Sequence, residues 1–467
     1  MKKVLITVLI LFALTISQSG AVEEITLGAT LSVDDCVELA IKNNPQIEIY
    51  RQQINMQDYK TGEVKSNYFP SIGGSIGYDY SNSDNKYGSN QNKNTSARIA
   101  LNQLLYSFGK VLSQVRMQKF YKIAAEYDLE NSILVTSNQV RSAYYGVLAA
   151  KANVDIQKAN VLVNERQYNR TKGFFDEGMV SKIDLVNQEV YLSDAKINLV
   201  TAENLYDNAV INLNNAMYIT DAPDYNIENT ETFNFKSNFA QINLINVANT
   251  STENIEPQDA VLTTQVEKTE LLENYNFEAY PYTLEESIEK AYNNRPDLLS
   301  MEATKDAAKE SLSYSKKSYF PDLTGSIGYN WGNNFYYNTN GINIGAYLST
   351  NNINVAETRL RIKESKAQLE IAEKNLELIK KNIYFEVQTA YTNMIQLEKN
   401  IPLLQTKVKH TLENYELADA RYEVGMGNFI ELQDAKENYN NAQREYVQTI
   451  YKYNIALVNL KTAMGEK

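Results

Sequence analysis

The sequence contains almost no cysteine or histidine. Among its 467 residues there is one Cys, Cys36, and one His, His410. A single Cys excludes an intramolecular disulfide framework or a Cys-rich metal site, and a single His removes most catalytic triads and zinc sites. The chain also shows no phosphate-binding glycine loop and no pattern of nucleophile, base and orienting residue. We therefore expect no metal, no cofactor and no enzymatic activity.

The sequence also lacks an excess of positive charge and long apolar segments. Lys and Arg number 45 against 57 Asp and Glu, so the net charge is −12. This balance argues against nucleic acid as a partner, because binding phosphates requires clustered Lys and Arg. With 22% charged residues and a mean hydropathy of −0.43, the chain is too polar for a bundle of membrane-spanning helices.

The N-terminus has the features of a secretory signal peptide. Two lysines precede an apolar segment from Val4 to Ile16, and Gly20 and Ala21 are small residues next to a possible cleavage site. The apolar segment is shorter than the roughly 20 residues that span a bilayer as a helix. We therefore predict that residues 1–21 are removed on export.

The rest of the chain is an internal duplication. Residues 33–78 return in the same register as residues 284–329, and residues 168–217 return as residues 415–464. One structural unit is thus used twice. The mature chain consists of a first repeat, a linker rich in Asn, Thr, Asp and Glu, and a second repeat, at residues 22–217, 218–282 and 283–467.

Each repeat begins with a helix and continues with a β-hairpin. Ser32 and Thr283 each start a capping-box pattern, and the helices run to about Asn67 and Ser318, before a Phe-Pro pair that cannot continue the helical ladder. Apolar and small polar residues then alternate with the period of two that is typical of strands. The predicted strands lie at about residues 69–81, 96–106, 320–331 and 341–349, with polar linkers at 82–95 and 332–341.

Long helices follow each hairpin. In the second repeat, apolar residues at steps of three and four predict a coiled-coil-like helix over about residues 352–422, with a break or kink at Pro402. Such a helix is about 100 Å long. The glycines that interrupt this pattern before a shorter return helix are Gly425 and Gly427 in the second repeat and Gly173 and Gly178 in the first.

Four strands with one apolar face cannot close a membrane barrel. An open sheet edge in hydrocarbon leaves backbone groups unpaired at several kcal/mol each, and about eight strands make the smallest common barrel. Three copies supply 12 strands and, if the shorter helices stack end to end, 12 helical columns. We therefore expect a mainly α fold in a homotrimer that forms a 12-stranded β-barrel and an α-helical tunnel.

These features resemble the TolC-type outer-membrane efflux proteins. The resemblance rests on the duplication, the early Asn-Pro, the Phe-Pro before each strand rich in Gly and aromatic residues, the paired turns with Ile183-Asp184-Leu185 and Ile430-Glu431-Leu432, and the terminal Ala-Met-Gly. It covers nearly the whole mature chain apart from the linker. It implies a channel-tunnel in the outer membrane of a double-membrane bacterium, with the helical part in the periplasm.

The resemblance also implies partners. Such channels work with outer-membrane lipid around them, a periplasmic adaptor (membrane fusion) protein and an inner-membrane pump or ABC-type exporter. They provide passive exit in tripartite efflux or type I secretion and catalyse nothing. The competing interpretation is an exported coiled-coil structural or adhesive surface protein, which explains the signal peptide and the long helices but not the two hairpins.

Two carboxylates are candidates for the pore constriction. In the family, carboxylates near the start of the last helix narrow the periplasmic mouth, and Glu431 and Asp434 fall on those positions. Their spacing of three places both on one helix face, so a trimer carries six carboxylates that attract cations. On spacing alone, an ordinary solvated helix face is the alternative.

Further site residues follow from the same resemblance. Tyr422 and Asp184 match two positions of a latch that holds the mouth closed, whereas Gly427 stands at the latch Arg position, so Lys182 is a possible substitute. The residues that match adaptor-docking tips are Gly178, Met179, Val424, Gly425 and Met426, for which helix capping by glycine is the alternative role. The candidates for an aromatic girdle are Tyr78, Tyr80, Tyr329 and Trp331, for which packing between helices and strands is the alternative.

Overall fold

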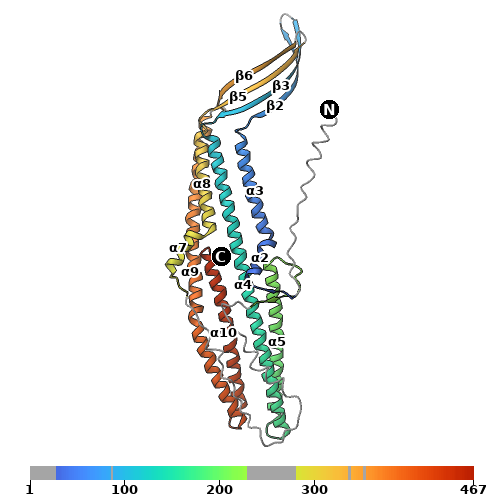
Figure 1. Ribbon diagram of the computed structural model, residues 1–467, viewed down its shortest axis with the longest axis vertical. Coiled ribbons are helices and arrows are strands. Elements are labelled where there is room, and N and C mark those ends of the chain that lie inside the picture. The colour runs from blue at the N-terminus through green and yellow to red at the C-terminus, as the bar shows by residue number, and fades with distance from the viewer. Residues whose placement is uncertain (1–27, 86–87, 229–279, 335–337, 351–353, 467) are drawn as a thin grey trace. The chain divides into compact units, whose positions relative to one another are not determined.

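The computed structural model describes residues 28–85, 88–228, 280–334, 338–350 and 354–466 (Figure 1). Most of them are helical, and no helix among them combines the length and the apolar composition needed to cross a membrane. They form two compact units that each take segments from both repeats. The first unit comprises Met1–Asn44, Gln139–Phe277 and Asn400–Ile455, and the second comprises Pro45–Asn138, Glu278–Lys399 and Ala456–Lys467. The predicted signal peptide lies outside the described residues, as does most of the inter-repeat linker.

The chain forms two helical hairpins, and residues 139–216 and 400–455 of these hairpins supply most of the first unit. α4 (Lys110–Asp176) is followed by α5 (Lys182–Ala216), and α9 (Val355–Glu423) is followed by α10 (Phe429–Ala463) (Figure 1). α4 and α9 have 67 and 69 residues, so each is about 100 Å long at 1.5 Å per residue. The long helices that the sequence predicts are therefore present in both repeats.

The sequence predicted only some of the positions at which these helices end. α9 continues without a break through Pro402, and α4 continues through Gly173. A proline removes one N–H donor from the helical ladder, and the buried side chains of Ile401 and Leu404 on either side keep the helix packed. α4 ends instead before Gly178, whose φ of +74° is accessible to glycine at little cost.

The core of the first unit surrounds Tyr144. Its buried hydroxyl donates to the carbonyl of Leu31 at 3.1 Å and also lies against the carbonyl of Glu228. These carbonyls flank the parallel pair of β1 (Thr30–Leu31) and β4 (Asn226–Ile227). The core residues around it are Val33, Cys36, Val37, Leu39, Ala40, Val140, Val147, Leu148, Ile156, Leu213, Met217, Val447 and Tyr451.

Cys36 lies on α2 (Val33–Asn43), and its thiol is completely buried in this core. Burial raises the pKa of the thiol to about 12, because a thiolate is poorly solvated there. Cys36 is therefore an inert packing residue.

The first helices of each repeat lie in the second unit, apart from α2, which lies in the first unit. The single helix expected at the start of each repeat is in fact two: α2 is followed by α3 (Pro45–Ser66), and α7 (Leu284–Asn294) by α8 (Pro296–Lys317). The residue before each proline is extended, because the proline ring disfavours the helical conformation of its predecessor. The capping boxes predicted at Ser32 and Thr283 are both present.

The second unit also contains the β-sheet. Its strands are β2 (Ser71–Asn85), β3 (Gly88–Tyr106), β5 (Asp322–Asn334) and β6 (Asn338–Ser349), in the order β2-β3-β5-β6 (Figure 1). All neighbours are antiparallel, and β3 pairs with β5, so the hairpins of the two repeats form one sheet. The strands extend into the predicted polar linkers, because backbone pairing does not depend on polar or apolar side chains.

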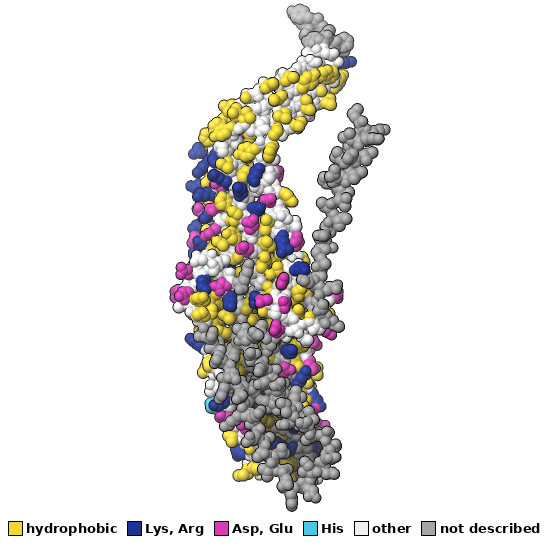
Figure 2. All heavy atoms as spheres, in the orientation of Figure 1, with side chains coloured by type: hydrophobic (Ala, Val, Ile, Leu, Met, Phe, Trp, Pro, Cys, Tyr) yellow, Lys and Arg dark blue, Asp and Glu magenta, His cyan; other side chains and the backbone are white. Residues whose placement is uncertain are grey.

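The two faces of this sheet differ in chemistry. One cross-strand row consists of Ile72, Leu101, Ile327 and Ile344, and the next row on the opposite face consists of Gly73, Ala100, Gly328 and Asn343. Ile76 is 86% exposed and Ile344 is 76% exposed, so nothing in the described chain covers the apolar face. Figure 2 shows hydrophobic side chains gathered over the sheet. Such a face is stable only against another apolar medium or partner.

We expect Tyr144→Phe to lower the free energy of unfolding by about 1 kcal/mol, because the hydrogen bonding of the buried hydroxyl to the carbonyls of Leu31 and Glu228 is lost. Thermal unfolding followed by circular dichroism measures the change. Tyr59→Phe is the matched control, since Tyr59 is 76% exposed and its change should stay within about 0.5 kcal/mol. Equal melting temperatures for wild type and Tyr144→Phe would contradict this role.

Candidate functional site

Both helical hairpins end in the same glycine turn. At the first turn, Gly178 N donates to Phe175 O and Met179 N donates to Phe174 O. At the second, Gly425 N donates to Tyr422 O at 3.1 Å and Met426 N donates to Arg421 O at 2.9 Å. Gly425 has a φ of +72°, so each turn is a Schellman cap that satisfies the last carbonyls of its helix.

The turns also present apolar side chains. The exposed fraction is 65% for Met179, 69% for Val424 and 78% for Met426. The glycines therefore have a capping role, while the residues beside them form an exposed apolar surface at the end of each hairpin. Burying this surface in a partner would be favourable.

Gly427 has no space for a side chain. A Cβ atom there would lie 2.7 Å from the backbone N of Tyr422 and 2.9 Å from the backbone C of Arg421. Because both atoms belong to the backbone, the turn itself would have to shift to accept any other residue. The glycine at the family's Arg position is thus required by this turn.

The two predicted constriction carboxylates both lie on the exposed face of α10. Glu431 is in the first turn of the helix and Asp434 follows one turn later. Arg421 Nη1 lies 2.6 Å from Glu431 Oε1 and joins the last turn of α9 to the first turn of α10. Within the described residues, no ion pair involves Asp434.

The two predicted latch residues have separate partners within the chain. Asp184 Oδ2 accepts from Ser181 N at 3.1 Å and from Ser181 Oγ at 2.7 Å, as the acidic residue of the capping box of α5. Tyr422 packs against Phe429, and the guanidinium of Arg170 lies 5.5 Å above the Tyr422 ring. Among the described residues of this single chain, no hydrogen bond joins Tyr422 to Asp184.

Arg170 links the two hairpins near their ends. Its Nη2 donates to Asp419 Oδ1 at 2.8 Å, with both side chains partly buried. α4 of the first repeat is therefore fixed to α9 of the second repeat by a charged hydrogen bond, which is stronger than a neutral one.

A buried polar layer lies further along the hairpins, between the first-repeat and second-repeat helices. Lys436 Nζ on α10 donates to Asn164 Oδ1 at 2.7 Å and to Gln167 Oε1 at 3.1 Å, both on α4. Gln433 Nε2 donates to Gln188 Oε1 on α5 at 3.0 Å. Lys436 is only 2% exposed, and its ammonium partners here are neutral amides.

Burial controls the protonation of this lysine. Desolvation lowers the pKa of Lys436 from its ordinary value to about 8, and the nearby Glu437 opposes that shift. The ammonium also lies 5.7 Å from the centre of the Tyr191 ring, a favourable cation–π geometry. Burying an ammonium among neutral amides lowers stability unless its hydrogen bonds compensate for the lost hydration.

The predicted girdle residues lie on the apolar face of the sheet. Trp331 pairs with Ala97, which pairs with Ile76, and Tyr329 lies in the neighbouring row on the same face. Tyr78 and Tyr80 continue this face towards the β2–β3 turn and are 64% and 54% exposed. The alternative role, packing between helices and strands, leaves such exposure unexplained.

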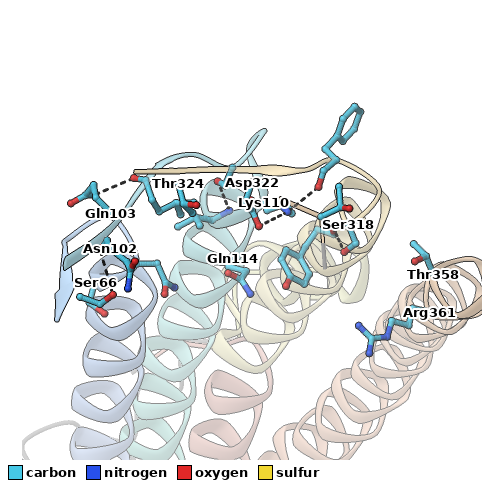
Figure 3. Close-up of a pocket in the computed structure, with 18 of the residues that line it drawn as sticks. Ser66, Asn102, Gln103, Lys110, Gln114, Ser318, Asp322, Thr324, Thr358 and Arg361 are labelled. Atoms are coloured by element: carbon cyan, nitrogen blue, oxygen red, sulfur yellow. Dashed lines mark hydrogen bonds and ion pairs between the residues drawn. The ribbon is translucent and has the colours of Figure 1, made fainter. Parts of the chain in front are cut away.

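A polar cavity of about 750 Å³ lies where the sheet meets the helices of the second unit (Figure 3). Lys110 Nζ lies 2.8 Å from Asp322 Oδ2 and donates to Phe320 O at 3.0 Å. Other lining residues labelled in the figure are Ser66, Asn102, Gln103, Gln114, Ser318, Thr324, Thr358 and Arg361. In the part of the chain that the structure describes, no cluster of three or more His, Cys, Asp or Glu could hold a metal ion.

Several residues near the hairpin ends were missed by sequence reasoning. These residues are Arg170, Arg421 and Lys436. They make the charged contacts near the hairpin ends, yet none of them stands in a family motif. Lys436 had a detectable signal, because it occupies an inward-facing position of α10 between Leu432 and Tyr439. The partners of Arg170 and Arg421 depend on tertiary packing and turn geometry.

An uncovered apolar sheet joined to paired helices of nearly 70 residues defines a class of membrane proteins that combine β-strands with long helical hairpins. The chain belongs to the outer membrane efflux protein family, whose model matches residues 36–217 and 287–466. The resemblance inferred from the sequence is thus confirmed. The chain is an outer-membrane protein of an efflux family and not an enzyme.

Individual relatives are distant. Outer membrane protein TolC of Vibrio cholerae is 22% identical over 455 residues, covering 94% of this chain and 92% of that protein. Alkaline protease secretion protein AprF of Pseudomonas aeruginosa is 27% identical over 161 residues, and the match covers 34% of this chain and 33% of AprF. The crystal structure of CusC has a TM-score of 0.73 at 13% identity, covering 95% of this chain and 94% of CusC, which establishes the shared fold.

We expect the pH dependence of stability to change in Lys436→Met. The folded-state pKa of about 8 lies below the unfolded value, so the folded state loses its proton first and stability rises with pH between about 8 and 10.5. Wild type should therefore gain about 2.5 kcal/mol relative to Lys436→Met between pH 7 and pH 10. Urea unfolding of both proteins at the two pH values measures this gain.

The exposed Lys407 on α9, which pairs with Glu445 on α10, provides the control. Lys407→Met should keep the wild-type pH profile, because it leaves the buried Lys436 in place. Parallel profiles for wild type and Lys436→Met would show that the buried lysine does not titrate in this window.

Proposed function

We propose that the chain is one third of an outer-membrane channel-tunnel through which substrates leave the cell passively, driven by an inner-membrane transporter. The observation that carries this proposal is the four-stranded sheet with an uncovered apolar face. β2 and β6 are its outer strands, and each has one edge without a partner strand in the described chain. In lipid such edges must be paired, because no water is present to bond the backbone.

Closure by copies of the same chain solves this problem. Three copies give 12 strands, which form a barrel wide enough to contain a lumen. The small and polar face, with Gly73, Gly328 and Asn343, then lines the lumen, and the isoleucine-rich face contacts lipid. Tyr78, Tyr80, Tyr329 and Trp331 would form the aromatic girdle at the membrane surface.

The helices also have surfaces suited to other copies. Exposed apolar residues follow a heptad spacing along α5, at Ile183, Val186, Val190, Ile197, Val200 and Ile211. A second series follows α9 at Ile371, Leu378 and Phe385. Exposed heptads of this kind are stable when they pack against another helix. They support a homotrimer in which neighbouring chains continue the helical wall of the tunnel through the periplasm.

The same features favour a channel over an adhesive coiled-coil protein. A surface coiled coil would bury the exposed apolar residues of α5 and α9 but would leave the apolar face of the sheet exposed to water.

The proposed pore constriction consists of Glu431 and Asp434, and the proposed latch of Tyr422 and Asp184 would form between hairpins of neighbouring chains. The residues proposed to dock the periplasmic adaptor are Gly178, Met179, Val424, Gly425 and Met426.

The similarity to AprF, a protein secretion component by its name, supports a role in type I secretion beside an ABC-type exporter. The similarity to TolC over most of both chains is consistent with either secretion or tripartite efflux with a pump. In both cases the adaptor would contact the ends of the helical hairpins, where the exposed apolar residues lie.

The mass of the detergent-extracted protein tests the trimer. Native mass spectrometry should give three times the mass of one mature chain, and Ile197→Asp should reduce the trimer fraction at least about tenfold, because a carboxylate is buried in the apolar stripe. Asn198→Asp is the matched control on an exposed position of the same helix outside the stripe. A stable, folded wild-type monomer would rule out the shared barrel and with it the channel.

A further inference from the structure

The two repeats use one equivalent carboxylate differently. In the first hairpin, Asp184 closes the capping box of α5 by accepting from Ser181. Its counterpart in the second hairpin is Glu431, and there Asn428 Oδ1 caps the helix by accepting from Ile430 N at 3.0 Å. Glu431 is therefore free of capping, and its carboxylate lies 2.6 Å from Arg421.

The position of the guanidinium is dictated by the turn between α9 and α10. A side chain at position 427 would collide with backbone atoms, so no arginine fits there. Arg421 lies in the last turn of α9, where the Schellman cap fixes its backbone through the bond from Met426 N. The cation at this end of the hairpin thus comes from the helix before the turn.

Two other cations of the helical hairpins are engaged elsewhere. Arg170 on α4 binds Asp419 and covers the Tyr422 ring. Lys436 is buried among amides of α4. Among the described ion pairs, Arg421 is therefore the cation that contacts a predicted constriction carboxylate, and Asp434 has none.

We propose that Arg421 sets the ion selectivity of the channel mouth by neutralising Glu431, so that Asp434 supplies the uncompensated carboxylate of each chain. This inference rests on the proposed channel function. A trimer would then carry three net negative charges at the constriction in place of six. Cation preference is correspondingly weaker than the two carboxylates alone would produce.

The pair lies within one hairpin. Both partners belong to the same turn of the same chain, so the compensation does not depend on contacts between chains. Arg421 is 56% exposed and Glu431 is 47% exposed, and such a pair adds little to stability. Its effect is on the local field, which acts over about a Debye length of 8–10 Å.

Reversal potentials in planar bilayers under a KCl gradient test the proposal. Arg421→Gln should raise the ratio of K⁺ to Cl⁻ permeability at least about twofold, because it exposes the charge of Glu431. Arg421→Lys should keep the wild-type ratio, since it retains the charge. The double variant Arg421→Gln with Glu431→Gln should also return to the wild-type ratio, because Asp434 is again the single net charge.

Lys407→Gln is the control for removing an exposed cation from α9. Its pair with Glu445 is as exposed as the pair of Arg421 and Glu431, but it lies 14 residues earlier on α9, about 20 Å along the helix and beyond the screening length. An unchanged ratio in Arg421→Gln, or an equal shift in Lys407→Gln, would overturn the proposal. Absence of channels in trimeric wild-type protein would instead overturn the channel function itself.

Discussion

The constraint on which the structure depends is that backbone hydrogen bonds must be satisfied where water is absent. β2 and β6 each have an edge with no partner in the described chain, and the sheet between them has an apolar face that no other element covers. The open edges are unfavourable in lipid, and the apolar face is unfavourable in water. The proposed trimer and its closed barrel follow from this requirement.

Duplication provides the two hairpins, and divergence gives them different chemistry. Both long helices end in the same Schellman cap at Gly178 and Gly425, since the backbone demands it. The side chains after the caps differ: one carboxylate caps its own helix, whereas its counterpart, Glu431, binds Arg421. The two turns thus share the same cap, while the Glu431 side chain of the second hairpin is available to bind Arg421 at the proposed mouth.

The buried polar layer adds a second kind of specificity. Further from the turns, Val447 and Tyr451 of α10 contribute to an apolar core. Nearer the turns, Gln433 and Lys436 replace such packing with hydrogen bonds to amides. A desolvated ammonium lowers stability, and its hydrogen bonds to Asn164 and Gln167 hold α10 of the second repeat against α4 of the first.

Much of this architecture was determined by the sequence itself, because strand alternation, helix periodicity, capping boxes and glycine turns are local signals. The hairpins, the long helices and the family could therefore be predicted. Tertiary structure alone decided that β3 pairs with β5, that α9 continues through Pro402, and that Arg421 binds Glu431. These outcomes depend on residues distant in sequence or on the exact shape of a turn, and no local pattern encodes them.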